Sequence, residues 1–364
     1  MGLSFAGFKM LKVLTPIGPV IENKKEVVIS GTKYFISPTG NDKQDGLSAD
    51  ASFASIQKAL NLVQPGDGII LAEGVYLQDF FTERDGSKEK PIVITGSKKA
   101  IVKGTGESVK IVEIAHDYYV LQGFTVDGLA GDSGDKKNYR DKLIYVQGKD
   151  ALNGVVGMRI LDMDIKNAGG ECLRIKYFAQ KNEVAYSNIY GCGAYDFIFN
   201  GGGKNGEGVY VGTAPEQVAK DKNPTQDVDN SNENWIHDNN INTQGNECVD
   251  IKEGSSGNLV EKNKCTGQKD RESGGFDARG SGNIFRGNES YGNSGAGIRL
   301  GGDKDDDGIN NIIENNFLHD NENGGIKIVR NPQGIICGNK FENNKKADFA
   351  GEFGSENKKN KSCL

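Results

Sequence analysis

Two series of short motifs recur along this chain with a shared spacing near 25 residues, and that spacing constrains the fold more than any other feature. Members of the first series begin with asparagine, at Asn188, Asn239, Asn263, Asn288, Asn315 and Asn339. The last five of these asparagines lie 24, 25, 27 and 24 residues apart. Members of the second series are strand-like runs with apolar residues at positions two and four, at 172–176, 208–212, 248–252, 275–279, 297–301 and 325–329.

Two interleaved series with one period indicate two faces of one repeating coil. Coils of this length are typical of a parallel β-helix, in which each coil hydrogen-bonds to the coils above and below it. A β-propeller needs a longer repeat, and leucine-rich repeats would show leucine at fixed positions, which this chain lacks. Asparagine at a bend can adopt the left-handed conformation and pair with the asparagine one coil away. We therefore predict an all-β fold, a right-handed parallel β-helix with an internal asparagine ladder.

Both ends of the chain and one internal segment fall outside the repeat. Residues 1–31 are expected to be a leader or extended tail. They make a poor signal peptide, because lysines interrupt their apolar run and no clear cleavage motif follows. Residues 53–63 have helical apolar spacing between two strand-like runs, which predicts an N-terminal helical cap on the solenoid. The predicted domain spans 32–344, with a polar insertion loop at 214–232 projecting from the coil. The charged residues 345–364 are expected to form a C-terminal tail.

Six cysteines lie at spacings that match the coil. None forms a CxxC pair, which argues against zinc ribbons and thioredoxin chemistry. Taken in sequence order they are 20, 17 and 26 residues apart, about one coil each, which predicts the disulfides Cys172–Cys192, Cys248–Cys265 and Cys337–Cys363. Disulfides favour an oxidising compartment and hence a secreted protein. The alternative is a set of buried free thiols in a cytosolic protein.

The overall charge narrows the set of partners. A net charge of −6 argues against nucleic-acid binding through bulk charge. After the N-terminal segment, no stretch is long and apolar enough to span a membrane. The three histidines are widely spaced, so a histidine-based triad or zinc site is not expected.

Stacking the second series aligns charged side chains on one face of a sheet, because alternate residues of a strand point to opposite faces. The third positions are Arg174, Tyr210, Asp250, Asp277, Arg299 and Lys327, and the fifth positions include Lys176, Lys252 and Arg279. Glu171, Glu207 and Glu247 each lie one position before one of these runs. The purely structural interpretation is an exposed, solvated sheet with ion pairs such as Asp250–Arg279, each contributing roughly 0.2–1 kcal/mol. For the whole column we favour function.

The segments GNECVDIKEGSSGNLVEKNKCTGQ (245–268) and GGFDARGSGNIFRGN (274–288) resemble the catalytic core of the chondroitinase B and alginate lyase family. These are polysaccharide lyases with the pectin-lyase-like parallel β-helix fold. The resemblance implies that Lys252 is the catalytic base and that Arg279 assists it or donates the proton. It also implies that Glu247 ligates a Ca²⁺ ion, which neutralises the carboxylate of a uronate.

The chain departs from the family pattern at three places. Gly245 stands where the family has a second acid, and Gly280 stands where it has histidine. The spacing between the lysine and the arginine is lengthened by the insertion 268–273. Glu207, one coil earlier, is the residue expected to supply the missing metal ligand.

The chemistry of β-elimination fits the same residues. The carboxylate of the uronate must be neutralised, by a metal or by arginine and lysine, before the proton beside it can leave. Lysine acts as a base only if its pKa falls, and Arg279 and a bound cation would lower the pKa of Lys252 while Asp250 and Asp277 oppose that shift. Tyr210 is a candidate to protonate the leaving oxygen. Substrate-binding candidates are Arg174, Lys176, Asp250, Asp277, Arg299 and Lys327.

The sequence therefore predicts a secreted, monomeric lyase acting on an acidic polysaccharide, with no nucleic-acid or membrane partner. Three alternatives stay open. A uronan C5-epimerase shares the proton abstraction. A glycoside hydrolase on the same fold would use a pair of carboxylates such as Asp250 and Asp277. A non-catalytic glycan-binding or adhesion β-helix is the third alternative, because the fold alone does not separate these functions.

Overall fold

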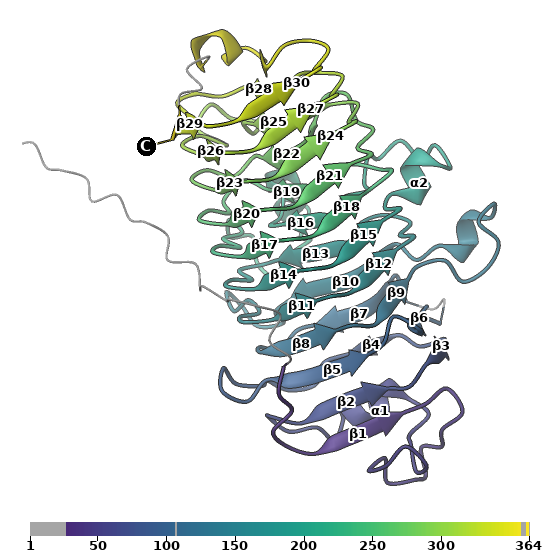
Figure 1. Ribbon diagram of the computed structural model, residues 1–364. Coiled ribbons are helices and arrows are strands. Elements are labelled where there is room, and N and C mark those ends of the chain that lie inside the picture. The colour runs from purple at the N-terminus through teal and green to yellow at the C-terminus, as the bar shows by residue number, and fades with distance from the viewer. Residues whose placement is uncertain (1–26, 106–107, 358–361, 364) are drawn as a thin grey trace, which may run out of the picture.

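The protein folds into a column of stacked coils, each of which contributes one short strand to each of three parallel sheets (Figure 1). This computed structural model describes residues 27–105, 108–357 and 362–363. Strand pairing along the column is parallel, and each strand pairs with the equivalent strand of the coils above and below it. The prediction of an all-β parallel β-helix is confirmed.

We name the sheets A, B and C. Sheet A has eleven strands: β1 (Lys33–Ile36), β2 (Gly68–Leu71), β5 (Ile92–Gly96), β8 (Tyr119–Gln122), β11 (Arg159–Leu161), β14 (Glu183–Ala185), β17 (Trp235–His237), β20 (Leu259–Glu261), β23 (Ile284–Arg286), β26 (Ile312–Glu314) and β29 (Ile336–Cys337). Sheet B has ten: β3 (Gly74–Tyr76), β6 (Ala100–Val102), β9 (Thr125–Asp127), β12 (Asp164–Lys166), β15 (Asn188–Tyr190), β18 (Asn240–Asn242), β21 (Lys264–Thr266), β24 (Glu289–Tyr291), β27 (Phe317–His319) and β30 (Lys340–Glu342). Sheet C also has ten: β4 (Phe80–Phe81), β7 (Lys110–Ile114), β10 (Lys142–Gln147), β13 (Leu173–Lys176), β16 (Val209–Val211), β19 (Val249–Ile251), β22 (Gly274–Ala278), β25 (Ala296–Leu300), β28 (Ile326–Ile328) and β31 (Phe349–Ala350).

The core runs through the inside of the column as rows of apolar side chains in register. On sheet C one such row consists of Leu173, Val209, Val249, Phe276, Ile298 and Ile326, all of which are buried. Because the side chains of a strand alternate between faces, the residues between these apolar positions point outward. Short apolar runs are therefore sufficient to build a continuous core.

Asparagine ladders line the corners between sheets, but two predicted members, Asn188 and Asn315, are not part of the ladder. Asn188 is exposed on β15, and Ser187 takes the ladder position before Asn239. Asn239, Asn263 and Asn288 bond in sequence through their side-chain amides, and the ladder continues through Asn316 rather than Asn315. The left-handed residue is the one before the ladder asparagine, as at Asn315 with φ 57°. The ladder position therefore follows the tight bend, where the side chain can point inward and satisfy buried backbone groups.

The N-terminal end is capped by helix α1 (Ile56–Leu60), at the purple end of the column (Figure 1). This helix is shorter than the predicted 53–63. It begins after Ser55, whose side chain accepts a hydrogen bond from the backbone N–H of Lys58, the usual way to satisfy the first turn. Of the predicted leader, residues 1–26 lie outside the described residues, while Val27 and Ile29 pack against apolar residues on the outer face of sheet A.

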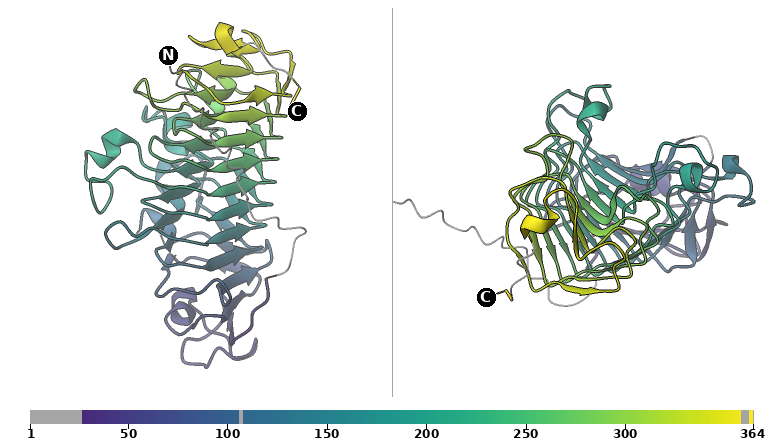
Figure 2. Two further views of the ribbon diagram at one scale, coloured as in Figure 1. Left: turned by 90° about the vertical axis from the view of Figure 1, so that its left-hand side faces the viewer. Right: turned by 90° about the horizontal axis from the view of Figure 1, so that it is seen from above.

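The insertion 214–232 does not simply project from the coil, which corrects the prediction. It begins with helix α3 (Pro215–Val218) and folds back over the preceding coil, so that its later residues Asp229 and Ser231 are buried. Other short helices are the 3₁₀ helix η1 (Lys136–Asn138), α2 (Ala194–Phe197) and the 3₁₀ helix η2 (Gly354–Asn357). Figure 2 shows segments that stand out from the outline of the stacked coils. Among the described residues, no helix has the length and apolar character needed to cross a membrane.

The three predicted disulfides are confirmed. Cys172 bonds to Cys192, Cys248 to Cys265, and Cys337 to Cys363. The first two join the start of a sheet C strand to a sheet B segment, one just after β15 and one within β21. They therefore fix the corner through which the chain enters sheet C.

Candidate active site

The predicted column of third-position residues forms on the outer face of sheet C. Arg174 pairs in register with Tyr210, which pairs with Asp250, and Asp250 pairs with Asp277. The row continues through Arg299 and Lys327. The period in the sequence therefore placed these six side chains correctly relative to one another.

The column is not exposed, however, which corrects the expectation of a solvated face. Arg174, Tyr210, Asp250 and Asp277 are buried residues, each no more than 3% exposed. The segments that enter and leave sheet C, at 193–206, 213–229 and 267–273, are longer than a simple corner and cover the strands. Buried charges are costly unless they are paired. Clusters of buried charged groups are common at functional sites, so the burial of this column favours function over a structural role.

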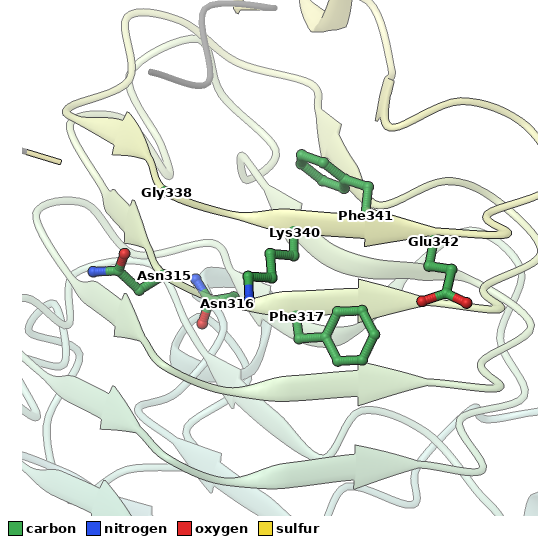
Figure 3. A pocket seen from close by; sticks show the side chains of 7 residues that line it. All are labelled: Asn315, Asn316, Phe317, Gly338, Lys340, Phe341 and Glu342. Atoms are coloured by element: carbon green, nitrogen blue, oxygen red, sulfur yellow. The ribbon is translucent and has the colours of Figure 1, made fainter. Parts of the chain in front are cut away.

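A cavity of about 290 Å³ opens over strands β16, β19 and β22. Tyr210, Lys252, Arg279 and Arg299 line it together with the carboxylates of Glu207 and Glu247. A larger hollow of about 850 Å³ lies elsewhere, on β27 and β30 of sheet B (Figure 3). There Lys340 and Glu342 lie beside Phe317, without a cluster of buried titratable groups. The chemistry therefore points to the smaller cavity.

Each cation of the cavity has a carboxylate partner, and the pairs differ from the predicted Asp250–Arg279 pair. Lys252 Nζ lies 2.7 Å from Asp250 Oδ2. Arg279 contacts Glu253 at 2.7 Å and Asp303 at 2.5 Å. Arg299 donates to both carboxylate oxygens of Asp277 at 3.0 Å. Asp303, in the segment that follows β25, thus places a carboxylate against Arg279 at the edge of the cavity.

The pKa of Lys252 moves in the direction opposite to the one its role as a base requires. Burial and Arg279 lower the pKa of this lysine, but Asp250, Tyr210 and Glu247 outweigh them and raise it well above its usual range. The contact with Asp250 at 2.7 Å is the closest of these interactions. Lys252 is therefore a cation as the site stands.

Three buried carboxylates come together beside Lys252. Glu207, Glu247 and Asp250 each place an oxygen within 4.8 Å of the others. Burial and the neighbouring carboxylates of Glu171 and Asp250 raise the pKa of Glu207 to about 7. Burial, Asp250 and Glu207 likewise raise the pKa of Glu247 well above its usual value. Like charges held this close in a dry site favour either protons or a bound cation.

The donor set of this cluster fits a hard divalent cation such as Ca²⁺. Oε2 of Glu247 and Oδ1 of Asp250 are buried and have no hydrogen-bond partner among the described residues. The same is true of Oδ1 of Asn246, which lines the cavity next to Glu247. Carboxylate and amide oxygens are the ligands that Ca²⁺ prefers. Sequence analysis had paired Glu247 with Glu207 as ligands but had assigned Asp250 to the substrate.

The two ends of the column do not line the cavity. Arg174 stacks on the ring of Tyr210 at 3.5 Å and pairs with Glu171 at 2.7 Å. Lys176 donates to the backbone oxygen of Lys222 at 2.7 Å. Lys327 donates to the backbone oxygen of Glu272 at 2.7 Å. These three predicted substrate-binding residues are engaged by the covering segments.

Sequence analysis missed the residues that the covering segments bring to the cavity: Lys204, Glu216, Gln217, Asp270, Glu272 and Ser273. Ser273 is the most central of these, because its Oγ contacts Glu247 Oε1 and lies 3.1 Å from Asp277 Oδ2. The available signal was the insertion 268–273 between the predicted lysine and arginine. An insertion beside a proposed site changes its walls.

Comparison with known proteins identifies the fold family. The family described as "Right handed beta helix region" matches residues 175–362, just over half of the 364-residue chain. The chain belongs to the right-handed β-helix family. No curated protein matches it in sequence.

Solved structures similar to this β-helix protein include lyases and a hydrolase. An alginate lyase from Paenibacillus sp. str. FPU-7 has 20% identity and a TM-score of 0.67, over 88% of this chain and 98% of the other. Pectate lyase Pel9A has 14% identity and a TM-score of 0.57, over 88% and 79%. An endo-xylogalacturonan hydrolase from Aspergillus tubingensis has 13% identity and a TM-score of 0.50, over 88% and 90%.

These comparisons confirm the resemblance to parallel β-helix polysaccharide lyases at the level of the fold. Because structures of this fold include both lyases and a hydrolase, the fold does not choose the reaction. The choice depends on the side chains of the cavity.

Proposed function

We propose that this β-helix protein is a polysaccharide lyase that cleaves an acidic, uronate-containing polysaccharide by β-elimination. The observation that carries the proposal is a single cavity that joins Lys252, Arg279 and Tyr210 to a cluster of three buried carboxylates. A lyase of this kind needs a base, a proton donor and a way to neutralise the uronate carboxylate. The cavity offers candidates for all three.

The charge balance of the cavity bears on how an anionic sugar binds. Carboxylates outnumber cations among the side chains that line it, by six to four. An anionic substrate therefore needs added positive charge. A Ca²⁺ ion held by Glu207, Glu247 and Asp250 would supply two positive charges, which would offset part of the negative charge of these ligands and of the substrate carboxylate. Arg279 and Arg299 would orient the substrate from the other side of the cavity.

In the proposed step, Lys252 Nζ in its neutral form takes the proton from C5 of the uronate. The electron pair of that C–H bond forms the C4–C5 double bond, and the bond from C4 to the glycosidic oxygen breaks. The departing oxygen takes a proton, which gives one chain with an unsaturated uronate end and another with a new reducing end. Lys252 must therefore lose its proton to solvent before each turnover.

Tyr210 is the better donor of that last proton, and Arg279 acts through its charge. Burial raises the pKa of Tyr210, so its hydroxyl keeps its proton at neutral pH. Although burial opposes the shift, Asp277 and Glu253 raise the pKa of Arg279 above its already high value. A guanidinium does not give up its proton in proteins. Arg279 therefore stabilises the anion that develops on the uronate.

The geometry disfavours a hydrolase built on Asp250 and Asp277. Both carboxylates are buried, and they are held by Lys252 and Arg299 respectively. A retaining hydrolase needs carboxyl groups about 5–5.5 Å apart that flank the bond, and an inverting one needs room for water between them.

We also propose that the protein is secreted and acts as a monomer. Three disulfides support an oxidising compartment, because such bonds persist outside the cytosol. An extracellular location agrees with a polymeric substrate.

The test is the ultraviolet absorbance of the unsaturated uronate, measured with alginate, pectate, glucuronan and dermatan. Each polymer is incubated with Ca²⁺ or with a chelator, using the wild type and Lys252→Ala. An absorbance rise that requires Lys252 supports elimination, names the substrate, and shows whether the cation is needed. New reducing ends without absorbance would replace the lyase by a hydrolase. Inverted C5 centres without chain cleavage, seen by NMR, would replace it by an epimerase. Binding without any reaction would favour a glycan-binding module.

A further inference from the structure

We infer that the cavity accepts one end of a polysaccharide chain and that cleavage is exolytic. This inference rests on the proposed lyase function and concerns the walls of the site. An enzyme that cuts within a chain needs a groove that continues on both sides of the bond. The cavity of about 290 Å³ is at the small end of the roughly 300–1,000 Å³ usual for small-molecule sites.

The first wall closes the side toward strand β13. Gln217 of helix α3 accepts a hydrogen bond from Arg174 at 2.7 Å, and the backbone oxygen of Lys222 accepts one from Lys176 at 2.7 Å. Both side chains are consequently buried. A chain that continued over β13 would have to displace this segment.

Hydrogen bonds hold the first wall firmly against the coil. The carboxylate of Asp229 accepts hydrogen bonds from the backbone N–H groups of Tyr177 and Phe178, at 2.7 and 3.0 Å. Thr213 Oγ1 donates to the same carboxylate at 2.6 Å. Since Asp229 itself is buried, these bonds tie the two ends of segment 213–229 to the coil.

The second wall closes the side toward strand β28, and it is the insertion 268–273. The backbone oxygen of Glu272 accepts a hydrogen bond from Lys327 at 2.7 Å. The backbone oxygen of Arg271 accepts one from Asn323 at 2.6 Å. The insertion thus reaches from the entry of β22 across β25 to residues of the coil that contains β28.

The two segments on the sheet B side of the cavity are also joined. Lys204 Nζ lies 3.0 and 2.9 Å from the two carboxylate oxygens of Asp270. Asn246 donates to the backbone oxygen of Lys204 at 2.6 Å. The segment after α2 and the insertion 268–273 therefore form a continuous rim.

The walls form hydrogen bonds with the basic side chains that a longer binding groove would need for the substrate. Arg174, Lys176 and Lys327 lie in line with the cavity along the column and would be the natural partners of further uronate groups. Each instead binds an oxygen of a wall. The inner cations Lys252, Arg279 and Arg299 remain at the cavity, enough for the terminal part of a chain.

The experiment follows product size and polymer viscosity during digestion of the polymer that gives the absorbance rise. The wild type is expected to release a single small unsaturated product from the first time points, with viscosity falling slowly as absorbance rises. A ladder of product lengths with an early collapse of viscosity would overturn exolytic cleavage and leave the lyase assignment intact. No absorbance with any polymer of the panel would overturn both.

A variant with residues 269–272 replaced by two glycines opens the second wall and serves as a further test. It is expected to shift the early products from one size to mixed lengths, whatever its overall rate of absorbance rise. Lys345→Ala, which removes an exposed ion pair with Glu322, is the matched control and should keep the wild-type product pattern. If the folded loop variant gives the wild-type pattern as well, the insertion does not set the cleavage mode and the inference fails.

Discussion

The outer faces of sheets B and C are built by the same coils with the same alternation of side chains, yet their ion pairs differ in exposure to solvent. On sheet B, Lys264 and Glu289 face each other at 3.0 Å with side chains 64% and 31% exposed. On sheet C, Lys252 and Asp250 lie 2.7 Å apart with side chains 14% and 1% exposed. An exposed pair of this kind contributes little to stability, whereas a buried pair is costly to break.

The difference comes from the connections between strands. Sheet B is entered through corners of two residues, such as 262–263 between β20 and β21. Sheet C is flanked by the longer segments 193–206, 213–229 and 267–273. Among the described residues, these segments give sheet C walls, and with them the low local dielectric that makes charge chemically useful.

The largest expected contrast between the two faces is in activity. Lys252→Ala should lower the rate of unsaturated-uronate formation by about 10²–10⁴-fold, the usual contribution of a positioned general base. Lys264→Ala on sheet B should leave the rate unchanged. Initial rates give the comparison, and polysaccharide binding by Lys252→Ala, measured by titration calorimetry, should persist. Equal rates for the two variants would remove Lys252 from the mechanism.

The second contrast is in stability. Arg174→Met should lower the free energy of unfolding by about 3–5 kcal/mol, because it leaves the buried Glu171 with fewer partners. Lys142 still pairs with Glu171 at 3.2 Å, so the loss of stability should lie near the lower end of that range. Lys264→Met should have little effect. Urea unfolding with the disulfides intact measures both, and similar midpoints would contradict the contrast.

The third contrast concerns the cation. Ca²⁺ at 100 times its dissociation constant should stabilise the folded protein by about 2.7 kcal/mol relative to the protein in chelator. Glu247→Gln should abolish that gain, while Glu289→Gln on sheet B should retain it. Thermal unfolding with and without Ca²⁺ provides the measurement. A gain that survives Glu247→Gln would place the ion elsewhere.

The smallest contrast is in pH dependence. Burial and Arg174 lower the pKa of Lys176 from 10.5 to about 7. Between these two values the unfolded chain binds a proton that the folded protein does not, so this lysine makes stability rise with pH from about 7 to 10.5. The slope is at most about 1.4 kcal/mol per pH unit. Lys176→Met should remove this contribution and Lys264→Met should not, as measured by urea unfolding at pH 7 and 9.

Much of the scaffold was predictable because the period of a solenoid is written directly in its sequence. Alternating apolar residues set the register of Arg174, Tyr210, Asp250 and Asp277, and the cysteine spacing gave the disulfides. The ladder was misplaced by one residue at Asn188, where Ser187 holds the position, and at Asn315, where the adjacent Asn316 fits the same period. Only the backbone bend decides which of them points inward.

The site was predicted less completely, for a different reason. Glu207 and Glu247 lie close together, because equivalent positions of neighbouring coils are adjacent, and their role as metal ligands stays a prediction. The role of Asp250 in the carboxylate cluster and the contacts of Ser273 were missed. Both depend on how the non-repeating insertions fold over the sheet, and no period describes an insertion.

The sequence by itself determined the coil, the stacking order, the disulfides and the row of charged residues, since each follows from local alternation and a repeat. The tertiary structure decided that this row is buried, which partners its cations take, and where the cavity ends. Those features arise from segments that are distant in the sequence and meet over sheet C. Their contacts set the dielectric, and the dielectric sets the pKa values on which the chemistry depends.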